Sequence, residues 1–449
     1  MNRRIVHGPG SGEHRSHDRQ DGKSLMEASL FTNNCHPLTS SPDQHFFGYY
    51  DICPYDPGER YILALKTPVM ARPPRKNETA VLGLVERERG NRFEAIGETT
   101  AWNWQQGARA QWLAQGHILY NTRQEGRPVA TISRVDGTTV RTLPMPLYAL
   151  DPTCETGLSV NFSRLHHLRP GYGYAGAGEP PRDPAPSDDG IYSIDLGSGK
   201  TQLIISLRTL AESAGVSDPS FIHWVNDLQF NTDGSRFAFL HRWSTGAALR
   251  GRIEAWLDRH WSVRQFLGRQ TWLKRLLGMQ GTNKSVVGLP FNTRLMTAAA
   301  DGSSLRVVSE CDVISHYDWK DERELLAWSI CPGQGRGFRR YHDGQGVVEI
   351  VGEKSMTHDG HCSYSPNRRF ILNDTYPDAR GVQHLYIYDT LSDKRIDIAE
   401  VPSVPHLRGP VRCDLHPRWS PSGRWICFDA TPDGTRQVYE YDLVQAGII

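Results

Sequence analysis

The sequence contains no run of about eighteen apolar residues, so no segment of it predicts a helix that spans a membrane. The N-terminal stretch MNRRIVHGPGSGEHRSHDRQDGKS is polar and lacks the hydrophobic part of a secretory signal, so we expect a disordered tail over 1–28 and a cytoplasmic location. The eight cysteines form no C-x-x-C pair, which argues against a zinc ribbon, and without export we expect them to be reduced. The formal net charge of +1 indicates no nucleic-acid partner.

The chain is instead rich in turn-forming and aromatic residues. Its 449 residues include 42 Gly and 28 Pro, together with 12 Trp and 17 Tyr. Glycine and proline interrupt regular elements and shape tight turns, whereas large aromatic side chains pack well on sheets. The composition therefore favours a turn-rich β protein over a helical bundle.

A repeated unit of short strands and turns runs along the chain. Near the C-terminus, LHPRWSPSGRWICFDATPDGTRQVYEYDL predicts a strand, an S-P-x-G turn, a strand, a D-G turn and a further strand. The same plan recurs upstream in GHCSYSPNRRFILNDTYPDARGVQHLYIYDTLSDKRIDI, ISHYDWKDERELLAWS and VNDLQFNTDGSRFAFLHRW. Three weaker copies are LYALDPTCETGLSVN, GARAQWLAQGHILYN and YYDICPYDPGERYILAL. There are thus seven units, each of about 40 to 60 residues, a period typical of propeller blades.

We therefore predict an all-β fold, a seven-bladed β-propeller over 29–449. The last unit stops after VYEYDL, one strand short of a four-stranded blade. We expect the missing strand to come from around Leu30 to Cys35, which would close the ring and leave no long exposed edge. A pair of β-sandwiches is the alternative that the strand pattern leaves open.

Aligning the units on their turns places one residue of each unit in an equivalent position, three residues before a hydrophobic residue or proline. Because the innermost strand of each blade lines the central channel, we expect these positions to lie at one level around it. Three consecutive blades then offer imidazoles at that level, which is typical of a divalent metal site, although a polar channel without an ion remains the alternative. The seven aligned residues are Asp51, Arg109, Leu147, Asp227, His316, His361 and His416.

The motif H-x-x-H followed by S-P, with H-P-x-W-S-P-x-G downstream, resembles the oligogalacturonate lyases, which are seven-bladed propeller polysaccharide lyases. The resemblance covers the last third of the chain, whereas the first 220 residues look like a broader group of bacterial propellers. It implies a divalent metal, usually manganese, held by histidines and a glutamine, and the imidazole ligands leave zinc as the alternative. His358 stands where that family has the glutamine. The ligands that the resemblance implies are His316, His358, His361 and His416, and the repeat alignment adds Asp227 as a further candidate ligand.

A lyase of this kind removes the C5 proton of a uronate and expels the 4-linked oxygen, so we expect an anionic oligosaccharide as the substrate. The candidate proton acceptors are His223, Arg242 and Tyr172. The candidate substrate contacts are Gln106, Arg109, Arg169 and Tyr174. Each of these residues has a structural alternative, as a stacked loop histidine, a salt bridge or a packed aromatic ring. A non-catalytic TolB-like propeller that binds a protein or glycan is the alternative function.

The segment 245–282 differs from the blades. It carries seven Lys or Arg against one Glu and one Asp, and its apolar residues recur near helical spacing. We predict a helical insertion in blade four. It would form either a cap packed over the propeller or a basic amphipathic surface that contacts a membrane or an anionic partner.

Overall fold

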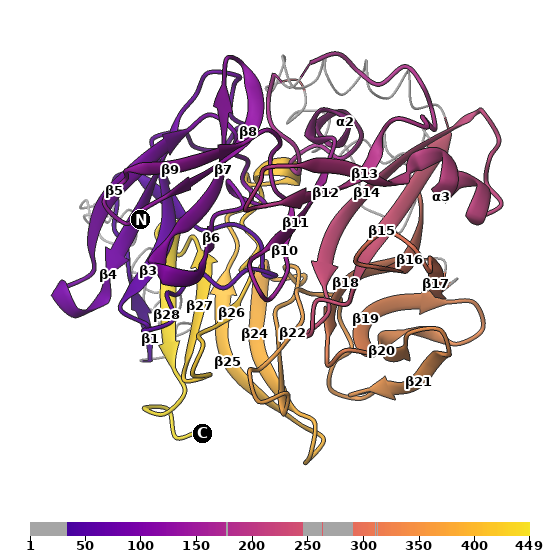
Figure 1. Ribbon diagram of the computed structural model, residues 1–449. Helices are drawn as coiled ribbons and strands as arrows, with labels where there is room; N and C mark the ends of the chain where they lie inside the picture. Colours follow the sequence, from indigo (N-terminus) through magenta and orange to yellow (C-terminus); the bar gives the residue numbers. More distant parts are fainter. Residues whose placement is uncertain (1–33, 177, 246–262, 264–290, 310, 312) are drawn as a thin grey trace, which may run out of the picture.

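The computed structural model describes residues 34–176, 178–245, 263, 291–309, 311 and 313–449 (Figure 1). The predicted tail over 1–28, and all but two residues of the 245–282 insertion, lie outside the described residues. No helix within the described ranges is both long and apolar enough to cross a membrane.

The described strands form seven four-stranded antiparallel sheets, which confirms the predicted propeller. Figure 1 shows the sheets following the chain around a ring, from indigo through orange to yellow, so the first and last blades are neighbours. Blade one contains β2 (Gln44–Phe46), β3 (Tyr61–Thr67), β4 (Ala80–Glu86) and β5 (Arg92–Thr99). Blade two contains β6 (Gln111–Trp112), β7 (Ile118–Gln124), β8 (Arg127–Ser133) and β9 (Thr139–Leu143). Blade three contains β10 (Ala149–Leu150), β11 (Thr156–Val160), β12 (Gly190–Asp195) and β13 (Thr201–Ser206).

The remaining blades follow the same order. Blade four contains β14 (Phe221–Phe230), β15 (Arg236–Thr245), β16 (Asn292–Ala299) and β17 (Arg306–Ser309). Blade five contains β18 (Val313–Trp319), β19 (Glu324–Cys331), β20 (Gly335–His342) and β21 (Gly346–Val351). Blade six contains β22 (Ser363–Tyr364), β23 (Phe370–Asn373), β24 (Val382–Asp389) and β25 (Lys394–Pro402). Blade seven contains β26 (Arg418–Trp419), β27 (Trp425–Ala430), β28 (Gln437–Asp442) and the N-terminal β1 (Cys35–Pro37).

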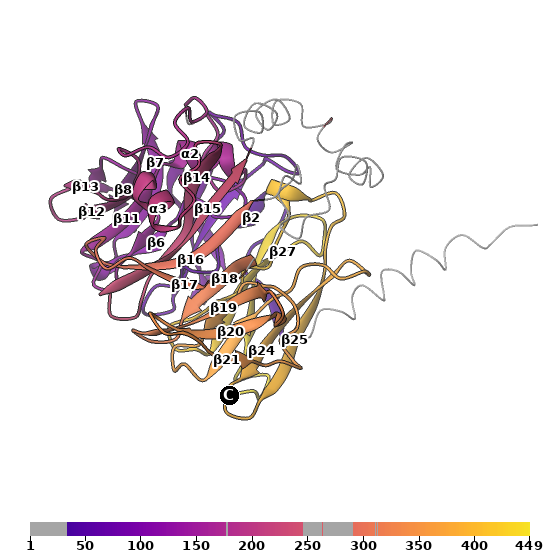
Figure 2. The same cartoon turned by 90° about the vertical axis from the view of Figure 1, so that its right-hand side faces the viewer.

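Helical segments join some of these strands. Among the described residues, the α-helices are α2 (Phe162–Leu168) and α3 (Leu207–Ser213), and both contact β14 (Figure 2). The same part of the chain contains the short 3-10 turns η1 (Arg87–Arg89), η2 (Ala114–Gly116) and η3 (Gly409–Val411). The side chain of Asn161 accepts a hydrogen bond from the backbone of Arg164, so it caps the N-terminus of α2.

The ring closes through β1, as the incomplete last unit predicted. β1 pairs antiparallel with β28, with Cys35 opposite Tyr441, so the strand lies slightly later in the chain than expected. Beyond it, the Leu38 backbone donates to the Val438 carbonyl at 2.8 Å, and the Leu38 side chain is buried. A strand from one end of the chain thus completes the blade at the other end and removes its open edge.

The aligned channel residues lie where the inner strands depart from regular pairing. The register of β14 against β15 shifts between Asn226 and Gln229, and that of β18 against β19 shifts between Ile314 and Tyr317. Asp227 has a φ of 55°, and the equivalent Arg109 and His416 have φ values of 53° and 43°. Positive φ is uncommon outside glycine and concentrates where the fold re-aims a functional side chain.

One expectation about cysteine is corrected. The eight cysteines were expected to be reduced, but Cys311 and Cys331 form a disulfide. The pairing of β18 with β19 explains this, because Val313 lies opposite Ile330 and so brings the two cysteines to adjacent strand ends. Their Cα atoms are 4.4 Å apart, within the range that a disulfide spans.

Closure by β1 leads to a stability prediction. A chain that begins at Asn34 is compared with one that begins at Ser40, which lacks β1 and the buried Leu38. The shorter chain loses the strand pairing and one buried leucine, so its unfolding free energy should fall by at least about 2 kcal/mol. Thermal and denaturant unfolding measure the difference. Equal stability of the two chains would contradict closure through β1.

Candidate metal centre

Three imidazoles from consecutive blades meet at the centre of the ring. His316 lies on β18, His361 precedes β22, and His416 precedes β26. The ring centroids of His316 and His361 are 4.1 Å apart, and those of His361 and His416 are 4.3 Å apart. All three side chains are buried. The structure therefore brings together the three histidines that the repeat alignment placed at one level.

Carboxylates orient two of these imidazoles. The Nδ1 atom of His361 lies 2.9 and 3.0 Å from the two oxygens of Asp374, and Nδ1 of His316 lies 3.0 Å from Asp359. A carboxylate on one ring nitrogen fixes the tautomer and leaves the other nitrogen as an acceptor, which is how metal-bound histidines are usually held. Neither Asp374 nor Asp359 was among the predicted residues.

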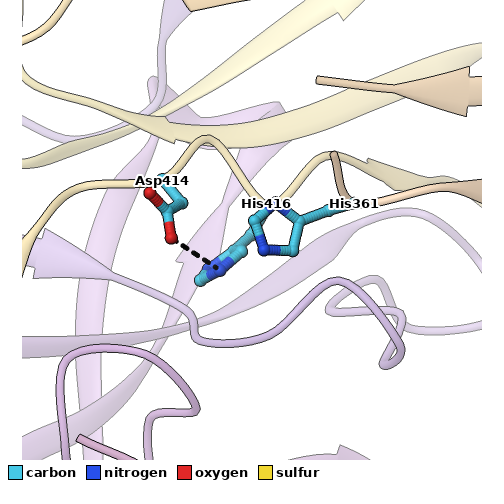
Figure 3. A group of neighbouring side chains, drawn as sticks. All are labelled: His361, Asp414 and His416. Carbon is cyan, nitrogen blue, oxygen red and sulfur yellow. Dashed lines mark ion pairs between the residues drawn. The ribbon is translucent and has the colours of Figure 1, made fainter. Parts of the chain in front are cut away.

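A carboxylate completes the cluster. Ligand atoms of His361, Asp414 and His416 all lie within 4.8 Å of one another (Figure 3). The Asp414 oxygen is 3.8 Å from His416 Nε2 and also pairs with Arg412 Nε at 2.5 Å. Asp414 was missed in the sequence, although its position two residues before His416 on an extended segment was the available signal.

The cluster has buried ligand atoms that are free to accept a cation. The Nε2 atoms of His361 and His416 are buried, and neither has a hydrogen-bond partner within the described part of the chain. Two buried imidazole nitrogens beside a carboxylate, with His316 adjacent, are a donor set that suits manganese, zinc and related divalent ions. The residues present therefore fit a divalent metal.

The titration behaviour of the imidazoles indicates where positive charge is favoured. Burial and the neighbouring His361 lower the pKa of His316 and His416. Burial also opposes the charged form of His361, but the Asp374 carboxylate outweighs it and raises the pKa of His361. The acidic groups thus favour one positive charge at the cluster, and a bound cation would supply it in place of a proton.

Glycine explains the motif around His361. A Cβ atom added at Gly360 would lie 1.7 Å from the Asp374 carbonyl oxygen, so the chain can approach this strand only with glycine there. This close approach lets Asp374 bind both the backbone and the side chain of His361. His358, at the start of the motif, is exposed, and its ring contacts Thr357 at 2.9 Å. The structure does not bring His358 into the cluster.

Asp227 also lies outside the cluster. Its carboxylate pairs with Arg242 at 3.6 Å and accepts hydrogen bonds from Asn226 at 2.6 Å and from the Tyr148 hydroxyl at 3.1 Å. The backbone of Asp227 in turn donates to the Tyr148 hydroxyl. Asp227 thus joins blade four to blade three.

Several predicted substrate residues take part in the packing of the inner ring. Arg109 pairs with Asp51 at 2.9 and 2.8 Å, and Gln106 donates to the Tyr148 hydroxyl at 2.7 Å. Tyr174 accepts a hydrogen bond from Asn121 at 2.7 Å, and its ring stacks on Phe162. These contacts hold neighbouring blades together.

Tyr172 lies between two arginines, one of which pairs with Asp414 of the histidine–carboxylate cluster. The Arg412 guanidinium that pairs with Asp414 also donates to the Tyr172 hydroxyl at 3.4 Å. On the other side, the Arg169 guanidinium lies 4.6 Å from the centre of the Tyr172 ring. Arg242 lies nearby, 5.0 Å from the ring of Phe291, which Arg169 also contacts. Tyr172, Arg169 and Arg242 therefore belong to one neighbourhood.

His223 lies on the opposite side of its strand from that neighbourhood. Its Nδ1 atom is 3.0 Å from Nε2 of His241, and the two rings stack. Across the sheet, His223 lies opposite Trp243, and its neighbour Trp224 lies opposite Arg242. Because successive residues of a strand face opposite sides of the sheet, His223 and Arg242 are on different faces of blade four.

Fold and site together define a seven-bladed β-propeller with a buried histidine–carboxylate cluster where its last three blades meet. An oligogalacturonate lyase from Vibrio parahaemolyticus shares the fold with a TM-score of 0.58 and 11% identity, over 91% of this chain and 93% of that chain. An oligogalacturonate lyase in complex with manganese has a TM-score of 0.56 and 11% identity, over 91% of this chain and 92% of that chain. TolB from Acinetobacter baumannii has a TM-score of 0.37 and 12% identity, over 75% of this chain and 62% of that chain.

No family model and no curated protein sequence matches this chain. The two lyase structures confirm the predicted resemblance at the level of the fold, which is what a likeness at 11% identity shows.

The cluster leads to a prediction about metal affinity. Asp374→Asn removes the charge that orients His361, so manganese affinity should fall about 10- to 100-fold, the usual effect of losing such a partner. Calorimetric titration of the purified chain measures it. As the matched control, His358→Ala should bind manganese like the wild type because His358 is exposed. Loss of binding in His358→Ala, with retention in His416→Ala, would contradict this cluster.

The buried His223 leads to a pH prediction. Burial and the charge of Arg164 lower the pKa of His223 to about 4. The pKa of a histidine in the unfolded chain is about 6.5. Between these values the unfolded chain binds more protons, so the folded state loses stability as pH falls from about 6.5 towards 4. Denaturant unfolding across this range should show a shallower pH dependence for His223→Gln. An unchanged dependence would contradict the assignment.

Proposed function

We propose that the protein is a metal-dependent lyase that cleaves uronate-containing oligosaccharides by β-elimination. The supporting observation is the pair of buried Nε2 atoms on His361 and His416 beside Asp414, without hydrogen-bond partners among the described residues. The fold is that of oligogalacturonate lyases, one of which was solved with manganese, so manganese is the ion we propose.

In this proposal His361, His416 and Asp414 hold the ion, with His316 adjacent. The ion, when bound, would act as a Lewis acid that offsets the negative charge of the substrate carboxylate and makes its neighbouring C5 proton easier to remove. Asp374 and Asp359 keep the imidazoles in the orientation that presents Nε2 to the centre. The rings of Tyr49 and Tyr50 pack on these imidazoles and exclude water from one side of the cluster.

Tyr172 is the proton acceptor we propose among the three candidates. Its hydroxyl contacts Arg412, which is paired with Asp414 beside the metal cluster. The guanidiniums of Arg412 and Arg169 both contact Tyr172, and they offset negative charge on its oxygen. The phenolic oxygen would take the C5 proton, the C5–C4 double bond would form, and the C4–O bond would break. The leaving oxygen would then acquire a proton.

The alternative is a non-catalytic propeller that binds a protein or a glycan. The hollow lined in part by Trp104, His166 and Pro410 has a volume of about 20 Å³, which is less than a sugar ring occupies, so it does not by itself supply such a site.

The test is formation of an unsaturated uronate. Uronate oligomers of several backbones are incubated with the chain and manganese, and the ultraviolet absorbance of the conjugated product is followed. Tyr172→Phe should lower turnover by about a hundredfold to ten-thousandfold, since that is the usual effect of losing a general base, while manganese binding stays unchanged. Absence of unsaturated product from every oligomer, with metal bound and the chain folded, would leave the binding alternative.

A further inference from the structure

The disulfide between Cys311 and Cys331 encloses the hairpin that carries His316. Cys311 precedes β18, and Cys331 is the last residue of β19. At the other end of this hairpin, the Lys320 backbone donates to the Glu324 carbonyl at 2.8 Å and closes the turn between the strands. The inner hairpin of blade five is therefore fastened at both ends, by a turn at one end and by a covalent bond at the other.

His316 lies at the point where this hairpin is irregular. β18 pairs with β19 at Val313 and Ile314, and pairing resumes at Tyr317. Ser315 and His316 fall in the register shift between these two paired segments, so the described ladder leaves them out. A bulge of this kind interrupts the ladder, and the backbone hydrogen bonds on either side then hold the two residues only indirectly.

A side chain from outside the hairpin orients the residues of the bulge. The Asp359 carboxylate accepts a hydrogen bond from the Ser315 hydroxyl at 2.6 Å and lies 3.0 Å from Nδ1 of His316. Hydrogen bonds weaken steeply as distance and angle change, so both contacts require the bulge to stay in place. The part of β18 before the bulge is held by two paired residues, by the disulfide and by the burial of Ile314.

The other two imidazoles of the cluster are held independently of this hairpin. Asp374 contacts the ring of His361 and accepts a hydrogen bond from the backbone of His416. His361 precedes β22 of blade six, and His416 precedes β26 of blade seven. A change at the start of β18 would therefore act on the cluster through His316.

A thiol reductant has access to the disulfide. Cys311 is partly exposed, and Cys331 leads directly into the exposed residues 332–334. A thiolate of a dithiol would attack the Cys311 sulfur, the S–S bond would break, and Cys331 would leave as a thiolate and take a proton. The second thiol of the reductant would then displace Cys311. The reductant ends as a disulfide, and the chain gains two thiols.

We infer that the Cys311–Cys331 disulfide is a redox switch that holds His316 in position and weakens metal binding when it is reduced. In the oxidised chain the hairpin is fastened at both ends, and His316 stays on Asp359. In the reduced chain the start of β18 keeps its two paired residues and the buried Ile314, so the loss of affinity is partial. That the ion is manganese rests on the proposed function.

The first test is calorimetric titration of manganese into the full chain, either oxidised or reduced with dithiothreitol that is removed under argon. Reduction should weaken manganese affinity about tenfold, the lower end of the effect of losing a group that orients a metal ligand. Cys311→Ser and Cys331→Ser should each bind like the reduced wild type, so the test survives if one of them does not fold. The matched control is Cys154→Ser, which removes a free cysteine of blade three and should behave like the wild type in both states.

Two further measurements separate a switch from a disulfide that only stabilises the fold. His316→Ala should bind manganese more weakly than the wild type, and its affinity should not change on reduction, because the switch acts through His316. Amide hydrogen exchange of the metal-free chain should become faster at residues 313–317 on reduction, while exchange at His361 and His416 stays the same.

Equal manganese affinity of the oxidised and reduced chains would overturn the inference, even if the reduced chain melts at a lower temperature. So would a full response to reduction in His316→Ala. If affinity falls on reduction but no uronate oligomer yields unsaturated product, the lyase proposal fails and the switch stands. If product forms and affinity is the same in both states, the switch fails and the lyase stands. If the oxidised chain binds no manganese, the proposed function fails and amide exchange decides: faster exchange at 313–317 on reduction supports the switch, and equal exchange overturns it.

Discussion

The Asp374 carboxylate organises the centre of this propeller. It accepts hydrogen bonds from the backbone and ring of His361 and from the backbone of His416 at 3.2 Å. A single buried carboxylate therefore joins blade six to blade seven and directs two imidazoles to one point. Because an unpaired buried carboxylate is costly, this arrangement persists only while all of these donors are in place. The positions of His361, His416 and the neighbouring Asp414 follow from it.

Two buried arginines elsewhere in the ring pair with carboxylates. Arg109 pairs with Asp51, and Arg418 pairs with Asp429 and also donates to the Gly48 carbonyl. These pairs hold adjacent blades in register where the inner strands are irregular. The histidine–carboxylate cluster differs from these pairs, since the Nε2 atoms of His361 and His416 are buried without hydrogen-bond partners among the described residues. Uncompensated groups of this kind are what a binding site needs before its ligand arrives.

The fold was more predictable than the site. Turn spacing and strand alternation are local, so seven blades and an N-terminal closing strand could be recognised from the sequence. The same alignment placed His316, His361 and His416 at one level, because equivalent positions in repeated units have equivalent places in a ring. It could not find Asp374 or Asp414, which lie outside the aligned position. It also favoured His358, which sits beside the right motif but is exposed.

The sequence by itself determined the number of blades, their order and the three histidines of the central level, since each depends on a repeated local pattern. The tertiary structure alone decided which acidic and basic groups meet them. Asp359 reaches His316 across 43 residues, and Asp374 reaches His416 across 42. The Arg169 guanidinium comes from the end of a helix in blade three and meets Arg242 of blade four over Phe291. Such contacts depend on how blades pack and on local bulges, and neither follows from the periodicity of a single chain.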